Sequence, residues 1–585
     1  MTSPAGDGSP RPGALPVPGG APAPYDALPG PGDALPDGLE AAISAWLEED
    51  PDPVTQLALT HLRDRARDGD PSAHAELTDA FAGPLAFGTA GLRGALGPGP
   101  ARMNRVVVGR AAAGLARYLI DGGHAGGRVI VGFDARYNSE RFARDTAEIL
   151  AAAGLRVLLC DRHQPTPVVA FGIRYYGCVA GVIVTASHNP PQDNGYKVYL
   201  GDGSQIVPPA DADIAARIAR AAEGPLSAIP RDGDYEFLGD DLVEAYVDRA
   251  VSLVADTPQR DVVWVHTALH GVGSDVVARA AAAAGFPAPC QVASQADPDP
   301  AFPTVGFPNP EEPGAIDLAV AKAIEVGADV ALANDPDADR CAVACPVDGA
   351  WRMLSGDELG WLLATASLDA GVRGNYACSV VSSTLLGDLA AAHGQPFVQT
   401  LTGFKWIARV PGLAFGYEEA IGYCLDPDAV ADKDGITAAL TVLALVARLK
   451  SEGRTLADLL DRLARDHGVC RTEPLSYRVA DLSLITDAMR RLRAAPPAVL
   501  AGETVAVDDL AAGTPGLPAT DALVFTGARV RAVVRPSGTE PKLKCYLQVR
   551  LPPASDLVPA RAAASALLAR LRTDLAACLG LRQAG

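Results

Sequence analysis

Three separate stretches of the chain repeat one order of strand, polar turn, small-residue helix, glycine and second strand. They begin at Arg128 (RVIVGFDARYNSERFARDTAEILAAAGLRVLLC), at Asp261 (DVVWVHTALHGVGSDVVARAAAAAGFPAPCQV) and at Tyr376 (YACSVVSSTLLGDLAAAHGQPFVQT). This order predicts a β-α-β unit with the glycine near the helix C-cap. Because more than a hundred residues separate the starts of successive stretches, we expect three homologous α/β domains. Unrelated α/β units within a larger sheet are the alternative.

The ends of the chain have a different texture. Residues 1–36 are dominated by glycine, proline and alanine, so they bury too little apolar surface to offset the entropy of ordering. Beyond Arg471 the pattern predicts an antiparallel α+β domain, with strands near residues 529–534 and 543–551. A chain of 585 residues divides into several domains of about 100–200 residues. The predicted division is an unstructured segment at 1–38 and domains at 39–253, 254–353, 354–470 and 471–585.

Charge and cysteine content restrict the class of protein. The formal net charge of −20 argues against a nucleic-acid or membrane partner, because both require a positive surface. The ten cysteines include no CxxC pair, which predicts reduced thiols, and "CAVAC" (341–345) is typical of one strand face rather than of a metal site. No signal peptide is evident, and the longest apolar run (437–447) is too short to span a bilayer. We expect a soluble, cytoplasmic protein.

The segment TASHNPPQDNGYK (185–197) follows the buried-looking strand GVIV. Two prolines and an Asn-Gly pair predict a rigid turn. A serine is a poor nucleophile without a base or a cation nearby, and His188 and Lys197 are the local candidates to activate Ser187. The alternative is that Ser187 only bonds the local backbone in a turn.

A second loop, NDPDADRCAV, places Asp335, Asp337 and Asp339 directly after a predicted buried strand. Three carboxylates so close together repel one another unless a hard cation lies among them, which indicates Mg²⁺ or Ca²⁺. An EF-hand is excluded, because Arg340 and Pro346 occupy the positions of its glycine and glutamate. Arg340 is then a candidate anion ligand beside the metal. A solvated acidic turn is the alternative.

Two further segments carry polar side chains on weaker grounds. In FGYEEAIGYCLDPDAVADKDG (415–435), Glu418 can accept hydrogen bonds from hydroxyl groups and Lys433 follows, although a helix start would explain the acidic residues equally well. In FGTAGLRGALG (87–97), Arg93 lies in a glycine-rich turn.

The segment RPSGTEPKLKCY (535–546) gathers many donors around a tight turn. A nest of this kind is typical of a phosphate site, and a cationic surface hairpin is the alternative. Its candidate ligands are Arg535, Ser537, Gly538, Thr539, Lys542 and Lys544. Together the loops supply a nucleophile, ligands for a divalent metal, a carboxylate that can bind hydroxyl groups and a phosphate-binding turn. This set favours phosphoryl transfer on a sugar phosphate.

The motifs TASHNPPQDNGYK, DPDADR, GYEEAIG and RPSGTEPK, in this order, resemble those of the α-D-phosphohexomutases. The segments FGTAGLRG, TALHGVG and GFKWI are further similar to the phosphoglucomutase and phosphopentomutase branch of that family. The resemblance implies an α/β fold of three related domains with mixed sheets, plus a C-terminal α+β domain, around a central cleft. It also implies a phosphosugar mutase, which interconverts sugar 1-phosphate and 6-phosphate, with glucose as the expected sugar.

The family resemblance also implies a role for each matching residue. Ser187 would carry a phosphoryl group and complete a Mg²⁺ shell with the three aspartates, and a sugar 1,6-bisphosphate would be the intermediate and activator. Lys197 and Arg93 would lie near the transferring phosphoryl group, with Lys197 or His188 assisting proton transfer. Glu418 would read sugar hydroxyls. The basic residues expected to face the substrate are Arg340, Lys405 and Lys433.

Two positions depart from the family pattern. Ala420 replaces a serine found in many glucose enzymes, and Lys542 and Lys544 stand where several relatives have arginine. The choice among glucose, mannose and pentose therefore stays open, as do the general base and the oligomeric state. A phosphatase and a catalytically idle sugar-phosphate sensor are two competing hypotheses. The mutase hypothesis predicts one pocket that gathers Arg93, Lys197, Arg340, Lys405, Lys433, Arg535, Lys542 and Lys544.

Overall fold

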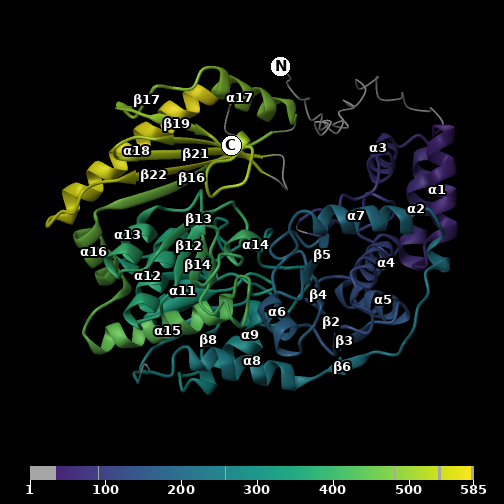
Figure 1. Cartoon of the computed structure of the whole chain (residues 1–585), viewed down its shortest axis with the longest axis horizontal. Helices are drawn as coiled ribbons and strands as arrows, with labels where there is room; N and C mark the ends of the chain where they lie inside the picture. The colour runs from purple at the N-terminus through teal and green to yellow at the C-terminus, as the bar shows by residue number, and fades with distance from the viewer. Residues whose placement is uncertain (1–34, 90, 257, 480, 538–541, 582–585) are drawn as a thin grey trace, which may run out of the picture.

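The computed structural model of the protein describes residues 35–89, 91–256, 258–479, 481–537 and 542–581. Residues 1–34, most of the segment predicted to lack structure, lie outside these ranges. The first helix begins at Asp37, two residues before the start predicted near Leu39. Along the longest axis, the N-terminal helices occupy one end of the molecule (purple in Figure 1) and the last helix the other (yellow).

Three helices form the N-terminal layer. Aspartate followed by proline starts the second and the third, because Asp52 and Asp70 accept N–H bonds of the first turn and proline has no N–H to satisfy there. The apolar faces of the three helices share a core that includes Trp46, Leu59 and Leu77. The helices are α1 (Asp37–Glu49), α2 (Pro53–Arg67) and α3 (Pro71–Ala80).

The first domain contains a six-stranded sheet of order β1-β5-β4-β2-β3-β6. Strands β4, β2, β3 and β6 run parallel, whereas β5 is antiparallel to β4 and β1 is antiparallel to β5. The strands are β1 (Leu92–Ala95), β2 (Arg128–Phe133), β3 (Arg156–Cys160), β4 (Ala180–Val184), β5 (Asp193–Leu200) and β6 (Glu236–Leu238). The helices are α4 (Arg105–Asp121), α5 (Ser139–Ala152), α6 (Thr166–Tyr175), α7 (Ala210–Ala221) and α8 (Asp240–Ser252).

The second domain contains a five-stranded sheet of order β11-β10-β9-β7-β8, in which β9, β7 and β8 are parallel. Its strands are β7 (Trp264–Thr267), β8 (Cys290–Gln291), β9 (Val330–Ala333), β10 (Ala342–Val347) and β11 (Ala350–Met353). Its helices are α9 (Gly273–Ala283), α10 (Ala293–Ala296) and α11 (Asp317–Val326). Cys345 is buried within β10 and Cys341 is buried directly before it, which agrees with the predicted core packing rather than with a metal site.

The third domain contains a four-stranded sheet of order β13-β12-β14-β15, with only β15 antiparallel to its neighbour. The predicted core helix around residues 437–447 lies within α15 and is almost entirely buried. The strands are β12 (Asn375–Ser379), β13 (Phe397–Thr400), β14 (Leu413–Glu418) and β15 (Gly422–Cys424). The helices are α12 (Gly356–Asp369), α13 (Leu385–Ala392), α14 (Phe404–Ile407), α15 (Gly435–Ser451) and α16 (Leu456–His467).

The three mixed sheets place one loop at the same topological position. In each sheet this loop joins a parallel strand to the antiparallel strand beside it: β4 to β5, β9 to β10 and β14 to β15. The first loop carries the serine motif, the second the three aspartates and the third the glutamates. Since ligands of α/β sheets bind outside the carboxyl ends of the strands, the repeated topology brings all three motifs to the edge where a site forms.

The C-terminal domain is an antiparallel five-stranded sheet of order β16-β22-β21-β20-β19 packed on α18. The two strands predicted in this region correspond to β21 and β22. The elements are β16 (Cys470–Arg478), α17 (Ser483–Ala494), β17 (Val499–Leu500), β18 (Glu503–Thr504), β19 (Ala506–Asp509), β20 (Leu523–Thr526), β21 (Val530–Pro536), β22 (Lys542–Arg550) and α18 (Leu557–Leu579). The predicted fold class is confirmed, and the predicted domain limits stay predictions. Among the described residues, no helix has the length and apolarity needed to cross a membrane.

Buried polar contacts join the first domain to the third. The Tyr246 hydroxyl on α8 donates to the Asp434 carboxylate at 2.8 Å, and Asp434 caps the N-terminus of α15. The Tyr199 hydroxyl on β5 donates to Asp432 at 2.6 Å. The two aspartates flank Lys433, so these contacts fix the position of that lysine relative to the first domain.

Replacing Asp434 with asparagine is expected to change how stability depends on pH. Burial raises the pKa of Asp434 from 3.8 to about 6, against the opposing effect of its hydrogen bonds. The folded protein therefore binds this proton more tightly than the unfolded chain, and the stability of the wild type falls as the pH rises from about 4 to about 6. Relative to Asp434→Asn, we expect the free energy of unfolding of the wild type to fall by about 3 kcal/mol over this pH range and to change no further at higher pH.

Thermal unfolding of both proteins between pH 4 and pH 8 measures this difference. Asp556→Asn, at the exposed N-cap of α18, is the matched control because it lacks the burial that drives the effect. A constant difference in stability between the wild type and Asp434→Asn across this pH range would contradict the prediction.

Candidate active site

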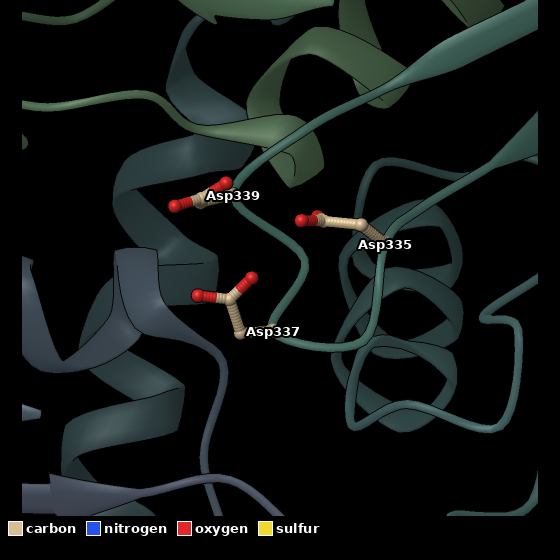
Figure 2. A group of neighbouring side chains, drawn as sticks. All are labelled: Asp335, Asp337 and Asp339. Atoms are coloured by element: carbon tan, nitrogen blue, oxygen red, sulfur yellow. The ribbon is translucent and has the colours of Figure 1, made fainter. Parts of the chain in front are cut away.

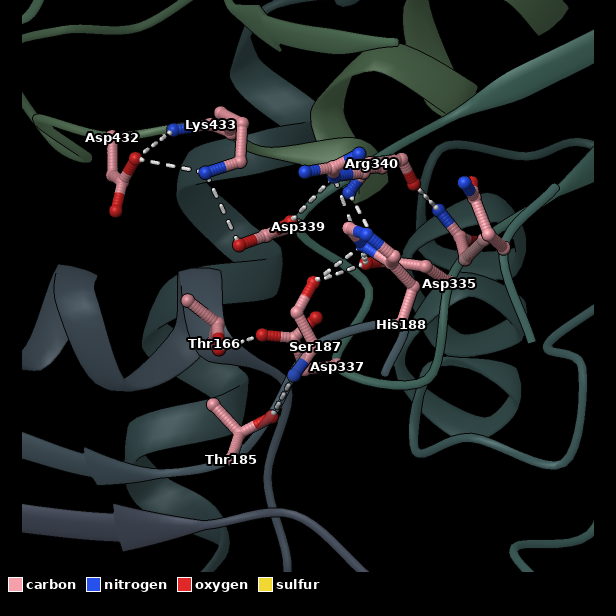
Figure 3. Close-up of polar contacts among 12 residues, drawn as sticks. Thr166, Thr185, Ser187, His188, Asp335, Asp337, Asp339, Arg340, Asp432 and Lys433 are labelled. Carbon is pink, nitrogen blue, oxygen red and sulfur yellow. Dashed lines mark hydrogen bonds and ion pairs between the residues drawn. The ribbon is translucent and has the colours of Figure 1, made fainter. Parts of the chain in front are cut away.

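Ser187 occupies the loop after β4 with its side chain directed at the aspartate loop. Its hydroxyl donates to Asp335 Oδ2 at 2.8 Å, and His188 Nδ1 lies 3.2 Å from the same hydroxyl oxygen (Figure 3). Its backbone N–H donates to Thr185 Oγ1 at 2.9 Å. The φ angle of Ser187 is +52°, a left-handed conformation that a non-glycine residue rarely adopts. The hydroxyl is thus presented on a constrained turn, 3% exposed.

The three aspartates project from the single loop between β9 and β10 (Figure 2). Each offers a carboxylate oxygen within 4.8 Å of the other two, and all three side chains are buried. Burial and repulsion from the other two carboxylates raise the pKa of Asp335 well above its usual value. Thr166, the first residue of α6, donates from its backbone to the Asp337 carbonyl at 2.9 Å and from its hydroxyl to Asp337 Oδ2 at 2.7 Å. A residue of the first domain therefore holds the aspartate loop of the second.

Cations from three domains surround the aspartates. Lys197 Nζ lies 2.7 Å from Asp337 Oδ2 and 2.9 Å from Asp339 Oδ2, and Lys433 Nζ lies 3.3 Å from the latter oxygen. Burial alone would raise the pKa of Asp339, but Lys197 and Lys433 hold it far below its usual value. The backbone N–H of Arg340 donates to Asp335 Oδ1 at 3.1 Å. Lys197 belongs to the first domain, Arg340 to the second and Lys433 to the third.

The donor set around the aspartates fits a hard divalent cation. Oδ1 of Asp337 and Oδ1 of Asp339 are buried and have no hydrogen-bond partner within the described part of the chain. Buried carboxylate oxygens without partners are costly, and oxygen ligands are those that Mg²⁺ and Ca²⁺ prefer. Asp335, Asp337, Asp339 and the Ser187 hydroxyl would hold such a cation.

One cavity of about 890 Å³ opens beside Ser187 and receives lining residues from all four domains. Seven of the eight basic residues expected to converge line it: Arg93, Lys197, Arg340, Lys405, Lys433, Lys542 and Lys544. Arg535, the eighth, does not line the cavity. It lies beside Tyr546, which does line it. Ser187, His188, Asp339 and Glu418 also face the cavity, whereas Asp335 and Asp337 lie behind it in contact with Ser187 and Lys197.

The third-domain loop presents two glutamates with different surroundings. Glu419 accepts hydrogen bonds from the hydroxyls of Ser379 at 3.1 Å and Ser382 at 2.9 Å. Glu418 lies beside Lys433, and a Cβ at Gly422 would come within 2.3 Å of the lysine stem and 3.1 Å of Glu418 Cγ. Burial raises the pKa of Glu418 although Lys433 and Arg340 oppose the shift. Of these two glutamates, Glu418 is therefore the one with capacity to bind a hydroxyl in the cavity.

The C-terminal hairpin contributes the remaining cations. Lys544 on β22 is the register partner of Arg535 on β21, and the Ser537 N–H donates to the Lys542 carbonyl at 2.8 Å. Gly538 and Thr539, predicted as phosphate ligands, lie outside the described residues. Across the cavity, Lys405 at α14 donates to the hydroxyl of Thr89 in the first domain.

Several residues at the site were not predicted from the sequence. Thr166 contacts the aspartate loop and Arg136 the serine loop. Arg136 lies in the predicted polar turn of the first β-α-β unit, and no prediction was made for Thr166. Arg531 of β21 also lines the cavity. So does Glu311, on the loop before α11, where burial raises its pKa to about 7. No motif marked these positions, because each acts through a contact between segments far apart in the chain.

Comparisons with known proteins agree with this architecture. Four models described as phosphoglucomutase/phosphomannomutase alpha/beta/alpha domains I, II and III and C-terminal domain match residues 84–224, 244–348, 355–466 and 477–556. The chain therefore belongs to the phosphoglucomutase/phosphomannomutase family, and it is an enzyme of the isomerase class. The N-terminal helices α1, α2 and α3 lie before the first matched residue.

Individual relatives carry different substrate names. A Haemophilus influenzae protein named "Probable phosphomannomutase" is 50% identical over 77% of this chain and 93% of its own length. The human "Phosphopentomutase" is 35% identical over 88% of this chain and 92% of its own length. A structure of a phosphoglucomutase/phosphomannomutase family protein from Burkholderia thailandensis superposes with a TM-score of 0.66 at 21% identity, covering 85% of this chain and 98% of that one, which shows the shared fold.

Removing one aspartate is expected to weaken divalent cation binding. Because Asp337 would supply a ligand oxygen directly, Asp337→Asn should raise the dissociation constant for Mn²⁺ by at least about tenfold. Electron paramagnetic resonance of free Mn²⁺ in a titration measures this constant without any substrate. Asp432→Asn is the control, since Asp432 is equally buried but bonds Tyr199 and Lys433 instead. Equal affinities in the two variants would contradict the assignment.

Proposed function

We propose that this protein is a phosphosugar mutase that moves a phosphoryl group between the 1-hydroxyl and the 6-hydroxyl of a hexose, with glucose as the first substrate. The contact between Ser187 Oγ and Asp335 Oδ2, at 2.8 Å, is the observation that carries the proposal. In this contact the hydroxyl of the serine motif meets one of the three carboxylates that fit a metal. The serine would carry the phosphoryl group between the two sugar positions.

Each half of the reaction is an exchange of one P–O bond for another. The bond between phosphorus and Ser187 Oγ breaks as the free sugar hydroxyl forms a new bond to phosphorus, which yields a sugar 1,6-bisphosphate. After the bisphosphate reorients, its other phosphoryl group returns to Ser187 Oγ and the product leaves. A Mg²⁺ ion bound by the three aspartates would stabilise negative charge on the transferring group.

Proton transfer accompanies both halves. Burial and the nearby cations Arg340 and Arg93 hold the pKa of His188 well below its usual value, which favours the neutral imidazole. Its Nδ1 lies 3.2 Å from Ser187 Oγ, within reach of a proton exchanged at that oxygen. Lys197 forms ion pairs with two carboxylates, which favours its charged form and suits it to charge stabilisation. Of the two predicted candidates, His188 is therefore the proposed proton acceptor.

The other cavity residues suit the binding of a sugar bisphosphate. Glu418 would accept hydrogen bonds from sugar hydroxyls. Lys405, Lys542 and Lys544 would bind the phosphate that is not reacting, with Arg535 beside them. A cavity of about 890 Å³ lies within the range of small-molecule sites, and this supports a bound intermediate that turns without leaving.

A pentose 1-phosphate is the second candidate substrate. The side chain of Ala420 has no hydroxyl, unlike the serine found at this position in many glucose enzymes. Glu419 already accepts hydrogen bonds from Ser379 and Ser382. Fewer polar contacts favour a sugar with fewer hydroxyls. The similarity to the human protein named "Phosphopentomutase" also supports this alternative.

Replacing the phosphoryl carrier is expected to abolish the reaction. Ser187→Ala should lose at least about 10⁴-fold in kcat, because the variant has no side-chain oxygen to carry the group, whereas Ser367→Ala, a buried serine of α12, should retain wild-type activity. A coupled assay of glucose 6-phosphate formation from glucose 1-phosphate measures kcat. Intact-mass spectrometry should find one phosphoryl group on the wild type after incubation with glucose 1,6-bisphosphate and none on Ser187→Ala.

Two different outcomes of this experiment would assign different functions. Release of inorganic phosphate without isomer formation would indicate a phosphatase. Ligand binding without turnover, and without phosphorylation of Ser187, would indicate a sugar-phosphate sensor. Either result would end the mutase proposal.

A panel of substrates tests the choice of sugar. We expect the highest kcat/KM for glucose 1-phosphate, ahead of mannose 1-phosphate and ribose 1-phosphate. The variant Ala420→Ser should restore a hydroxyl contact and raise the preference for glucose over ribose by about tenfold, the value of one hydrogen bond. A higher kcat/KM for ribose 1-phosphate in the wild type would replace the first candidate with the second.

A further inference from the structure

A buried arginine in the loop after β2 contacts the whole serine loop. The side chain of Arg136 is 1% exposed, and its guanidinium donates to four backbone carbonyls. Nη2 lies 2.7 Å from the carbonyl of Ser187 and also bonds that of Asn189. Nη1 lies 2.8 Å from the carbonyl of Pro190 and 3.2 Å from that of Asp193.

Two further contacts hold the guanidinium in place. Asp134 Oδ2 lies 3.4 Å from Arg136 Nε, and the Arg136 backbone N–H donates to Asp134 Oδ1 at 3.0 Å. The ring of Phe302, from the segment between α10 and α11 of the second domain, lies 4.9 Å from the guanidinium carbon. The arginine is thus fixed on one side by its own loop and on the other by the domain that carries the aspartates.

These contacts address the strain in the serine loop. Ser187 has a φ of +52°, and such a conformation persists only where surrounding contacts over-determine it. Here the N–H of Ser187 is bonded to Thr185 and its carbonyl to Arg136. With both backbone groups of the residue held, the direction of its Cα–Cβ bond is fixed, and the hydrogen bond to Asp335 sets the position of the hydroxyl.

We propose that Arg136 is a positioning residue, which holds residues 187–193 so that Ser187 Oγ stays against the aspartate loop. The proposal rests on the proposed role of Ser187 as the phosphoryl carrier. Arg136 does not line the cavity, so it acts through the serine loop and has no contact with substrate.

The rigid fork of arginine suits this task better than any other side chain. Arginine offers five N–H donors in one plane, whereas lysine concentrates its charge and its donors at one nitrogen. Lysine at position 136 would keep the charge opposite Asp134 but could not span carbonyls at both ends of the loop. A displacement of about 1 Å at a reacting atom costs roughly 100-fold in rate.

Arg136→Lys is the first test. We expect kcat to fall by about 100-fold while KM for the sugar phosphate changes by less than about twofold, because the side chains proposed to bind the sugar and its non-reacting phosphate lie outside the serine loop. The matched control is Arg105→Lys. Arg105 is also buried in the first domain and pairs with Asp145 at 2.6 Å, far from the serine loop in its contacts. We expect the control to lower the melting temperature and to leave kcat within about twofold of the wild type.

Hydrogen exchange gives a readout that does not depend on activity. Amides in the segment 185–197 should exchange at least about tenfold faster in Arg136→Lys than in the wild type, with no such change in Arg105→Lys. If the wild type proves to have no mutase activity but this local change is seen, the proposed function is wrong and the positioning role of Arg136 is supported. If exchange in this segment is unchanged in Arg136→Lys, or rises equally in the control, the positioning role of Arg136 is refuted.

A milder variant covers the case in which Arg136→Lys does not fold. Phe302→Leu keeps the arginine and its carbonyl contacts but removes the ring beside the guanidinium. We expect a smaller fall in kcat, about two- to fivefold, with KM unchanged and faster exchange confined to 185–197. If Arg136→Lys does not fold, wild-type kcat and wild-type exchange in Phe302→Leu would overturn the proposal.

Discussion

Three carboxylates buried within 4.8 Å of one another are the constraint on which the rest of this structure depends. At about 4 Å and an effective dielectric constant near 20, each pair of such charges repels by about 4 kcal/mol. Lys197, Arg340 and Lys433 offset that repulsion, and each comes from a different domain. Docking of the three domains therefore stabilises the aspartate loop, and the ion pairs that complete the site also hold the domains together.

The repeated topology explains how three domains deliver different chemistry to one place. Each mixed sheet has a loop between a parallel and an antiparallel strand, and these three segments carry the serine motif, the three aspartates and the two glutamates. Close backbone approaches bring them together. A Cβ at Gly435, the start of α15, would lie 2.2 Å from the Arg340 carbonyl, and one at Gly271 would lie 2.2 Å from Pro336. These glycines let neighbouring segments pack directly against the aspartate loop.

The sequence predicted the fold class and most of the polar residues that meet in the cavity, because both depend on local patterns. Strand and helix periodicity marked the three α/β units, and the repulsion of Asp335, Asp337 and Asp339 marked a cation site. Arg136, Thr166 and Glu311 could not be found in this way. Their importance comes from partners 51 residues away for the Arg136–Ser187 contact and 171 away for Thr166–Asp337. A single sequence contains no signal for contacts of that range. Arg535, predicted to face the pocket, instead lies beside it.

The lysines of the C-terminal hairpin make physical sense for a ligand with two phosphate groups. Arginine binds a phosphate through two parallel hydrogen bonds and so fixes its orientation, whereas the lysine ammonium acts as a point charge with rotatable donors. Under the proposed mechanism each end of a bisphosphate must take the non-reacting position in turn, and the two ends differ in geometry. Lys542, Lys544 and Lys405 can accommodate both because they impose charge without a fixed angle. The same loss of bidentate contacts also weakens the hold on either orientation, which favours turning within the cavity over a long-lived complex.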